Sequence, residues 1–210
     1  MFSIKETTIG DAWLNAVFLV LQEGRRSIPD DKGMIQEVLS LVIQITAPSE
    51  EDMIVQEYGS QEVLSFMRKN FQEQQSIANW KYSYADRLYN YNGANQIQHV
   101  IKVLRSNAFS KSATISLLNT AADDLHTPCL VALDFKLRDN TLFITGFFRS
   151  QDIGKKMYAD AIQLLHLGKL ISASLNVEAI EITHFINSAH IYESDRPILL
   201  LMLEQIKRIK

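Results

Sequence analysis

Apolar residues recur at every third or fourth position in several stretches of the chain, a spacing that predicts amphipathic helices. Residues 8–23 show this spacing most clearly, and Gly24 follows as a stop signal. A longer segment, residues 158–175, is apolar on most faces, which is typical of a helix buried in the middle of a fold. The same kind of pattern predicts three more helices, over residues 60–72, 95–105 and 197–209.

Short apolar and β-branched runs bounded by turn residues predict strands over residues 38–45, 113–118, 130–137, 142–148 and 179–186. The turn sequence RDNT separates the third run from the fourth, so these two should pair as a hairpin. Strands and helices do not alternate as strand–helix–strand units. The sequence therefore predicts an α+β fold, in which helices pack a mixed or largely antiparallel sheet around one long buried central helix.

Two segments carry weaker signals. EGRRSIPDDKG, residues 23–33, combines proline, paired aspartates and glycine, and is expected to be a loop that holds two arginines. WKYSYADRLYNY, residues 80–91, is dense in tyrosine and matches no single element.

Length and composition are those of an ordinary globular protein. Of the 210 residues, 47% are hydrophobic and 21% are charged. A chain of this size buries a sizeable core without disulfides or metals, and we see no repeat, low-complexity tract or linker. We therefore expect one domain over residues 1–210.

Charge and cysteine content exclude several classes of function. The formal net charge is -3, with 21 Lys and Arg against 24 Asp and Glu, which is no signature of nucleic-acid or anionic-membrane binding. Without a signal core or a run long enough to span a bilayer, the chain is expected to be cytoplasmic. One cysteine excludes an internal disulfide, and the five histidines show no ligand spacing, so no metal is expected.

Cys129 is the first candidate for chemistry. It follows Pro128 at the start of a predicted strand, but a lone cysteine is more often a small buried hydrophobe than a nucleophile. Arg149, Ser150 and Asp152 form a second candidate, because a guanidinium beside a hydroxyl suits a phosphate. A solvated turn is the alternative for these three residues.

Polar residues at two further places admit both a functional and a structural interpretation. His190 and Tyr192 lie two positions apart at the end of the last predicted strand, so their side chains should share one face. They could bind a sugar or pair at the rim of a sheet. Arg25 and Arg26 in the early loop could reach an anion or face water.

The order of these pieces changes the interpretation. EGRRSIPDDKG, EVLSF, NAFSKSATISLLN, TPCL, FFRSQD and AHIY follow one another as in the thymidylate synthase family, and the chain resembles its short archaeal-type members over about residues 10–195. The most specific part of the resemblance runs from the Pro-Cys pair through Arg-Ser-x-Asp to His-x-Tyr. It implies a thymidylate synthase-like α+β fold.

The resemblance also implies a reaction. Attack by the Cys129 thiolate on C6 of a pyrimidine nucleoside monophosphate makes C5 a carbon nucleophile, which then takes a one-carbon unit. The family draws that unit from 5,10-methylenetetrahydrofolate, or here from a related pterin. Members pair sheet against sheet, so a homodimer is expected.

Further residues receive roles only through this resemblance. Arg149, Ser150 and Asp152 with Arg25 would bind the substrate, the arginines and serine at the 5′-phosphate. His190 and Tyr192 would hold sugar hydroxyls. Glu62 in EVLSF would manage water and proton transfer near the base, and Tyr84 would lie close to the cysteine. Glu62 and Tyr84 are thus expected to be catalytic residues. Lys111 and Asp160 are the remaining residues that the resemblance places in contact with the substrate.

The most informative departure from the family is Asp160, eight residues beyond the Arg-Ser-x-Asp aspartate, where the family has an asparagine that reads the pyrimidine. A protonated carboxyl group can donate to N3 and accept from the amino group of cytosine, whereas a carboxylate clashes with O4 of uracil. Family members that hydroxymethylate cytidylate or deoxycytidylate carry aspartate here. Alternatively, Asp160 caps the buried helix.

Other departures are smaller. Lys111-Ser112 replaces paired arginines that reach the partner's phosphate, Leu130 replaces a histidine, and the sequence ends soon after HIYESD, without the family's long extension. An open site favours hydroxymethylation, which consumes water. The leading hypothesis is therefore a cytidylate or deoxycytidylate 5-hydroxymethylase. Thymidylate synthesis from dUMP is the alternative, and a catalytically silent nucleotide-binding protein is the alternative from another class.

Overall fold

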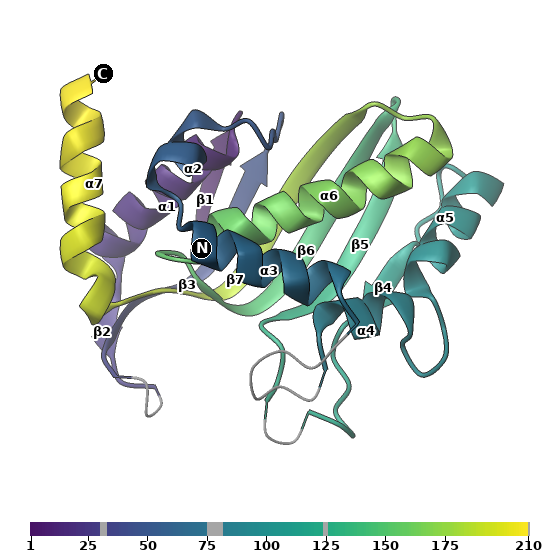
Figure 1. Cartoon of the computed structure of the whole chain (residues 1–210), viewed down its shortest axis with the longest axis horizontal. Coiled ribbons are helices and arrows are strands. Elements are labelled where there is room, and N and C mark those ends of the chain that lie inside the picture. The colour runs from purple at the N-terminus through teal and green to yellow at the C-terminus, as the bar shows by residue number, and fades with distance from the viewer. Residues whose placement is uncertain (30–32, 75–81, 124–125, 210) are drawn as a thin grey trace.

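The computed structural model describes residues 1–29, 33–74, 82–123 and 126–209, and a mixed sheet of seven strands forms its centre (Figure 1). The strands lie in the order β1-β3-β7-β6-β5-β4, and β2 pairs with β3. In chain order they are β1 Phe2–Glu6, β2 Arg25–Ser27, β3 Ile35–Ile45, β4 Thr114–Ser116, β5 Leu130–Arg138, β6 Thr141–Asp152 and β7 Ala179–Tyr192. The expected hairpin is present, since β5 and β6 pair in antiparallel orientation.

A long helix, α6 (Met157–Leu175), lies across the sheet and is the buried central helix that the sequence predicts (Figure 1). Residues 157–165 of this helix are all buried. Tyr158 docks two neighbours, because its ring packs on Trp13 at 4.3 Å and its hydroxyl accepts from Ser60 N at 2.9 Å. The other helices are α1 Ile9–Glu23, α2 Met53–Tyr58, α3 Gln61–Gln72, α4 Tyr84–Tyr89, α5 Gln96–Ser106 and α7 Arg196–Ile209.

Side-chain caps fix several helix boundaries where the sequence places them. Thr8, Ser60 and Asn95 each accept a hydrogen bond from a backbone N–H in the first turn of the helix that follows. These local signals explain why α1, α3 and α5 agree with prediction to within one residue. No helix within the described ranges is long and apolar enough to cross a lipid bilayer.

Two strand–helix–strand units occur within the sheet, whereas the sequence pattern predicts none. β6 and β7 run parallel with α6 between them, and β1 and β3 run parallel with α1 between them. In each unit the first strand differs from the prediction. Phe2–Glu6 was not recognised as a strand, and β6 continues four residues past its predicted end at Phe148. The mixed character of the sheet, as predicted, is nevertheless correct.

Three adjacent strands switch the face on which their buried residues lie, all at one level of the sheet. In β7 the buried side chains fall on even positions up to Ile186 and on odd positions from Ala189. β6 switches after Phe148, and β3 switches between Leu41 and Val38. The switch turns the polar side chains at the ends of β6 and β7 away from the helices, where unbroken alternation would have buried them.

The arginine-bearing segment was predicted as a loop, but Arg25–Ser27 forms β2 and pairs in antiparallel orientation with Ile35–Glu37 of β3. Three residues are too short for a period-two pattern to show. Predicted strand 113–118 is shorter, since β4 covers Thr114–Ser116. Residues 30–32 of the predicted loop and 80–81 of the tyrosine-rich segment lie outside the described residues.

Candidate functional site

Cys129 lies directly before β5, and its thiol is exposed. The backbone of β6 holds it, because Arg149 N donates to Cys129 O at 2.9 Å. Ser150 Oγ lies 3.6 Å from Cys129 Sγ, within hydrogen-bonding distance for sulfur. The Pro-Cys and Arg-Ser-x-Asp motifs, 20 residues apart in sequence, therefore meet at one thiol.

The guanidinium of Arg149 forms hydrogen bonds with the backbone of the segment that carries the cysteine. Its Nε donates to Pro128 O at 3.0 Å, and its Nη2 donates to Thr127 O at 2.7 Å. Nη1 reaches Ser150 Oγ at 3.3 Å. The arginine thus places a fixed positive charge beside the thiol while it braces the loop.

Tyr84, at the start of α4, reaches the residue after the cysteine. Its hydroxyl oxygen accepts from Leu130 N at 3.0 Å, and its own backbone N donates to Asn70 Oδ1 at 2.9 Å. Burial raises the pKa of Tyr84 well above its usual value, and the nearby Cys129 and Asp160 add to this. The phenol therefore stays protonated and keeps an O–H to donate near the thiol.

A buried ion pair between Arg87 and Asp123 holds in place the helix that carries Tyr84. Arg87, one turn along α4, donates to both carboxylate oxygens of Asp123 and to Leu117 O. Hydrogen bonding to Asp123 raises the pKa of Arg87, so the pair stays charged. The contact fixes α4 against the segment that leads to Cys129 and appears nowhere in the sequence motifs.

Four polar residues line up across four strands at the other end of the site. Arg25 on β2 pairs with Glu37 on β3, Glu37 pairs with His190 on β7, and His190 pairs with Asp152 on β6. Directly paired residues project to the same face of a sheet, so the four form one row. Tyr192 extends the row, with its ring 5.3 Å from that of His190.

Glu37 is the member of this row that sequence reasoning missed. Its carboxylate accepts from the hydroxyl of Ser188, two residues before His190. Burial lowers the pKa of His190 and raises that of Asp152, so both lean toward their neutral forms. Only the pairing of β3 with β7 reveals Glu37, because no spacing along the chain links it to the other site residues.

Asp160 lies in the first turn of α6 and is 5% exposed. Its Oδ2 accepts from Gln151 Nε2 at 2.9 Å. Burial raises its pKa to about 7, although Gln151 and the nearby Lys156 favour the charged form. The helix-cap interpretation of Asp160 is wrong, since Lys156 occupies the N-cap position and the Asp160 side chain bonds an amide on β6.

The family model described as thymidylate synthase matches residues 4–210. This chain belongs to the thymidylate synthase family. A Methanosarcina mazei protein named "Putative thymidylate synthase" is 31% identical over 198 residues, which cover 91% of this chain and 90% of that protein. Proteins of the same name from Methanothermobacter thermautotrophicus and Methanocaldococcus jannaschii are 29% and 26% identical, cover 91% of this chain, and match over 94% and 91% of their own lengths.

Membership in the thymidylate synthase family makes the protein a transferase that acts at C5 of a pyrimidine nucleotide. Family members bind a pyrimidine nucleotide, normally use methylenetetrahydrofolate and are typically dimeric. The geometry is compatible with that chemistry, because an exposed thiol, a cation and a row of polar groups gather at adjoining strand ends. Among the described residues, no three His, Cys, Asp or Glu side chains group as metal ligands.

The thymidylate synthase resemblance assigns roles to two further residues, and both are exposed. Glu62 is exposed in the first turn of α3, and Lys111 is exposed just before β4. Within the described ranges, no hydrogen bond or ion pair joins either side chain to the Cys129 segment. Their roles stay predictions.

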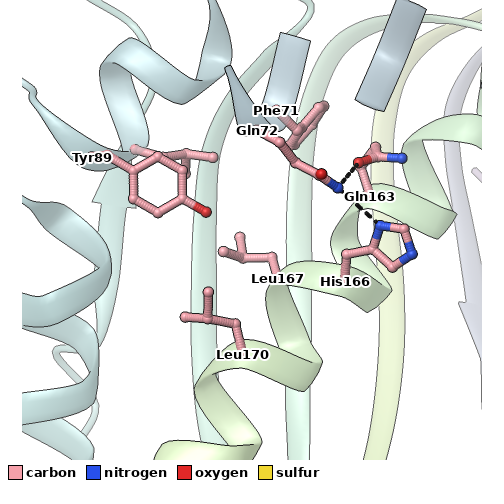
Figure 2. A pocket seen from close by; sticks show the side chains of 8 residues that line it. Phe71, Gln72, Tyr89, Gln163, His166, Leu167 and Leu170 are labelled. Atoms are coloured by element: carbon pink, nitrogen blue, oxygen red, sulfur yellow. Dashed lines mark hydrogen bonds between the residues drawn. The ribbon is translucent and has the colours of Figure 1, made fainter. Parts of the chain in front are cut away.

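A separate cavity of about 210 Å³ opens between α3, α4 and α6, and none of the predicted site residues lines it. Figure 2 shows Gln72 reaching both Gln163 and His166, at 3.2 and 3.1 Å. Phe71 connects this cavity to the Cys129 cluster, since its ring packs on that of Tyr84 with 4.8 Å between the ring centroids.

Proposed function

We propose that this member of the thymidylate synthase family is a 5-hydroxymethylase of cytidylate or deoxycytidylate. The observation that carries the proposal is Asp160, a buried carboxyl group with a pKa of about 7 at the family's base-reading position. Near neutral pH a substantial fraction of this group is protonated. It can therefore donate one hydrogen bond and accept another, as the cytosine edge requires.

An asparagine at this position complements uracil, whose edge offers an N3–H donor beside the O4 acceptor. Cytosine reverses both roles, with an acceptor at N3 and an amino donor at position 4. An ionised Asp160 facing uracil would set two acceptors together, at a cost of about 1–3 kcal/mol for a buried group. The acid form of Asp160 suits cytosine, because its O–H donates to the N3 acceptor while its other oxygen accepts from the amino group.

The reaction assigns one task to each group near the thiol. Cys129 Sγ bonds to C6, and the electron pair of the C5–C6 double bond becomes available at C5. Ser150 donates to the sulfur, and the Arg149 guanidinium donates to Ser150 Oγ and to Pro128 O, which holds the segment that carries the thiol. Tyr84 holds the cysteine segment through Leu130. Glu62, which receives its role through the family resemblance alone, would move protons through water near the base.

Hydroxymethylation leaves the oxidation level of the one-carbon unit unchanged. C5 would bond to the one-carbon carbon and lose its proton, with tetrahydrofolate as the leaving group as the C–N bonds to that carbon break. Hydroxide from water would then add to the exocyclic carbon, and the electron pair so displaced would expel the Cys129 thiolate from C6. Methylation needs in addition a hydride and the exclusion of water. The exposed thiol is compatible with the step that consumes water.

The row of polar residues suits the rest of the nucleotide. His190 and Tyr192 would hold the sugar hydroxyls, with Asp152 beside them, and Glu37 adds an acceptor to the same face. The phosphate would lie toward the guanidinium groups of Arg25 and Arg149.

The proposed one-carbon donor is 5,10-methylenetetrahydrofolate or a related pterin, which supplies carbon at the oxidation level of formaldehyde. The surroundings of α6 suit a flat, polar ring. Lys156 lies close to Asp160 and Asp152, and its Nζ is 5.8 Å from the centre of the Phe66 ring. A cation and an aromatic face are groups that a pterin would contact.

A homodimer is part of the proposal. The sheet face opposite α6 carries Phe147 and Phe185, whose rings stack at 5.7 Å and are 39% and 45% exposed. Leu39 is 58% exposed at the level where the strands switch face. An apolar surface of this kind is buried when two sheets pair. Lys111 would then meet the partner's phosphate, and the dimer would act in the cytoplasm.

Release of tritium from C5-labelled CMP, dCMP and dUMP, in the presence of methylenetetrahydrofolate, tests the proposal. We expect exchange with a cytosine nucleotide and a hydroxymethyl product by mass. Asp160→Asn should shift preference toward dUMP. Exchange with dUMP alone, with a methyl product, would instead identify a thymidylate synthase.

A silent nucleotide-binding protein is the competing class, and the departures at Lys111 and Leu130 favour it. It predicts binding of a nucleotide without tritium release from any of the three substrates. That outcome would overturn the proposed reaction.

A further inference from the structure

Two buried polar side chains lie behind Asp160 and have no part in the proposed reaction. Gln151 is 1% exposed and His184 is completely buried. Gln151 occupies the position between Ser150 and Asp152 on β6, and His184 lies on the neighbouring strand β7. Buried polar groups are costly unless they are paired, so these two need an explanation.

The pair forms a chain of hydrogen bonds that ends on the Asp160 carboxyl group. His184 Nδ1 lies 3.2 Å from Gln151 Oε1, and Gln151 Nε2 lies 2.9 Å from Asp160 Oδ2. An amide oxygen can only accept, so the first contact requires a proton on Nδ1 of His184.

A second observation supports that tautomer. His184 Nε2 is buried and has no hydrogen-bond partner in the part of the chain that the structure describes. Orphaned buried N–H groups are rarer than orphaned acceptors, so the proton belongs on Nδ1. Burial also lowers the pKa of His184 to about 3, which keeps the ring neutral and this single proton in place.

As a consequence, the side-chain amide of Gln151 cannot flip by 180° to exchange its oxygen and nitrogen. With Oε1 held by His184, the NH₂ group always faces Asp160, and Oδ2 always accepts. A proton on Oδ2 would point at a donor, so an acidic Asp160 carries its proton on Oδ1. Oδ1 makes no hydrogen bond to another described residue, which leaves it available to a ligand.

The assignment of donor and acceptor to particular oxygens matters, because a carboxylic acid that can exchange these two roles pairs with either pyrimidine. With its O–H at position 3 and its carbonyl at position 4 it matches cytosine, and turned over it matches uracil. An acid whose donor and acceptor oxygens are assigned in advance matches only one of the two edges. Rejection of the mismatched edge comes from two donors or two acceptors brought together.

We propose that Gln151 and His184 are positioning residues that fix the donor and acceptor oxygens of Asp160 and so restrict the site to cytosine. The inference rests on the proposed function, in which Asp160 contacts the base. Neither side chain touches the substrate; they act through the carboxyl group alone.

Charged and titratable groups around Asp160 come from three other places. Asp152 lies on β6, Lys156 at the head of α6, and Tyr84 on α4. Asp152 disfavours a charged Asp160, whereas Lys156 and the Gln151 amide favour it. None of these three groups bonds Oδ2, so the assignment of the two oxygens depends on Gln151.

The test compares cytosine with uracil nucleotides in variants of the full chain. Gln151→Met removes the amide at nearly constant volume, His184→Phe removes the ring nitrogens, and His184→Asn keeps a donor near the position of Nδ1. We expect the ratio of kcat/KM for dCMP over dUMP, from tritium release, to fall about tenfold in the first two variants. His184→Asn should restore the ratio to within about threefold.

A readout without substrate accompanies these ratios. The ¹³Cγ resonance of Asp160 reports its titration, and loss of the Gln151 donor should move the midpoint to higher pH. Ser172→Ala, a buried change about three turns further along α6, is the matched control and should move neither quantity.

Two outcomes separate failure of this inference from failure of the proposed function. If Asp160→Asn changes base preference while Gln151→Met and His184→Phe keep the native ratio within twofold, the positioning role is wrong. If Asp160→Asn leaves the preference unchanged, Asp160 does not read the base, and the proposed function falls together with this inference.

Discussion

The hydroxyl of Ser150 lies 3.6 Å from the sulfur of Cys129, and the same hydroxyl accepts from the Arg149 guanidinium at 3.3 Å. The serine therefore connects the two groups, since it accepts from the arginine and donates to the sulfur. A donor of this kind stabilises anionic sulfur more than neutral sulfur.

Ser150→Ala should slow the alkylation of Cys129 by iodoacetamide at pH 7 by a few fold, because the sulfur anion loses a donor. Ser188→Ala is the matched control, since Ser188 is the register partner of Ser150 on β7. Equal alkylation rates in the native protein and Ser150→Ala would contradict a role for this contact.

Cys129→Ser should abolish turnover, with residual activity below about 1% of native, because an alkoxide at neutral pH is far scarcer than a thiolate. Nucleotide binding should persist within a few fold, since in the proposed site residues on other strands would hold the sugar and the phosphate. Calorimetric titration with dCMP measures the binding, and tritium release measures the turnover. Retained turnover would remove Cys129 from the mechanism.

Tyr84→Phe should cost about 1 kcal/mol of stability and lower kcat more than it raises KM. The variant leaves Leu130 N without its acceptor and removes an O–H beside the thiol. Tyr89→Phe, on the same helix and facing the separate cavity, is the control. Equal kinetics for the two variants would show that the Tyr84 hydroxyl is dispensable.

Arg87→Met should destabilise the protein by about 3–5 kcal/mol, because Asp123 is left buried and charged without its partner. For a chain of this size that corresponds to a fall in Tm of roughly 10 °C. The double variant Arg87→Met with Asp123→Leu should recover most of the loss. A loss below about 1 kcal/mol in the single variant would mean that water reaches the pair.

His184 should make the protein sensitive to acid. Its pKa is about 3 when folded, against an ordinary value of 6.5, so the unfolded chain binds a proton that the folded chain refuses. Stability should therefore fall as the pH drops from about 6.5 toward 3, by about 2 kcal/mol at pH 5 relative to pH 7. His184→Asn should flatten this slope in urea unfolding curves, and an unchanged slope would show that water reaches His184.

Sequence reasoning succeeded where the signal is local. Helices α1, α3 and α5 begin at caps that can be recognised from one or two residues, and the β5–β6 hairpin depends on a short turn. The apolar surface of α6 likewise needs no knowledge of its neighbours. These features account for the correct prediction of a mixed sheet around a buried helix.

Contacts between distant segments were beyond that reasoning. Glu37 joins His190 only because β3 pairs with β7, and Gln151 meets His184 only because α6 connects two parallel strands. The end of β6 was misplaced for a related reason. The burial pattern shifts by one position after Phe148, and a rule based on strict alternation stops there.

The row that runs from Arg25 through Glu37 and His190 to Asp152 draws on both halves of the polypeptide. No fragment that ends before β7 can display it, so ligand affinity is a property of the completed sheet. Mass action then links occupancy to global unfolding, and a nucleotide at a hundred times its Kd should add about 2.7 kcal/mol. Thermal shift with CMP, dCMP and dUMP thus ranks the three substrates before any turnover is measured.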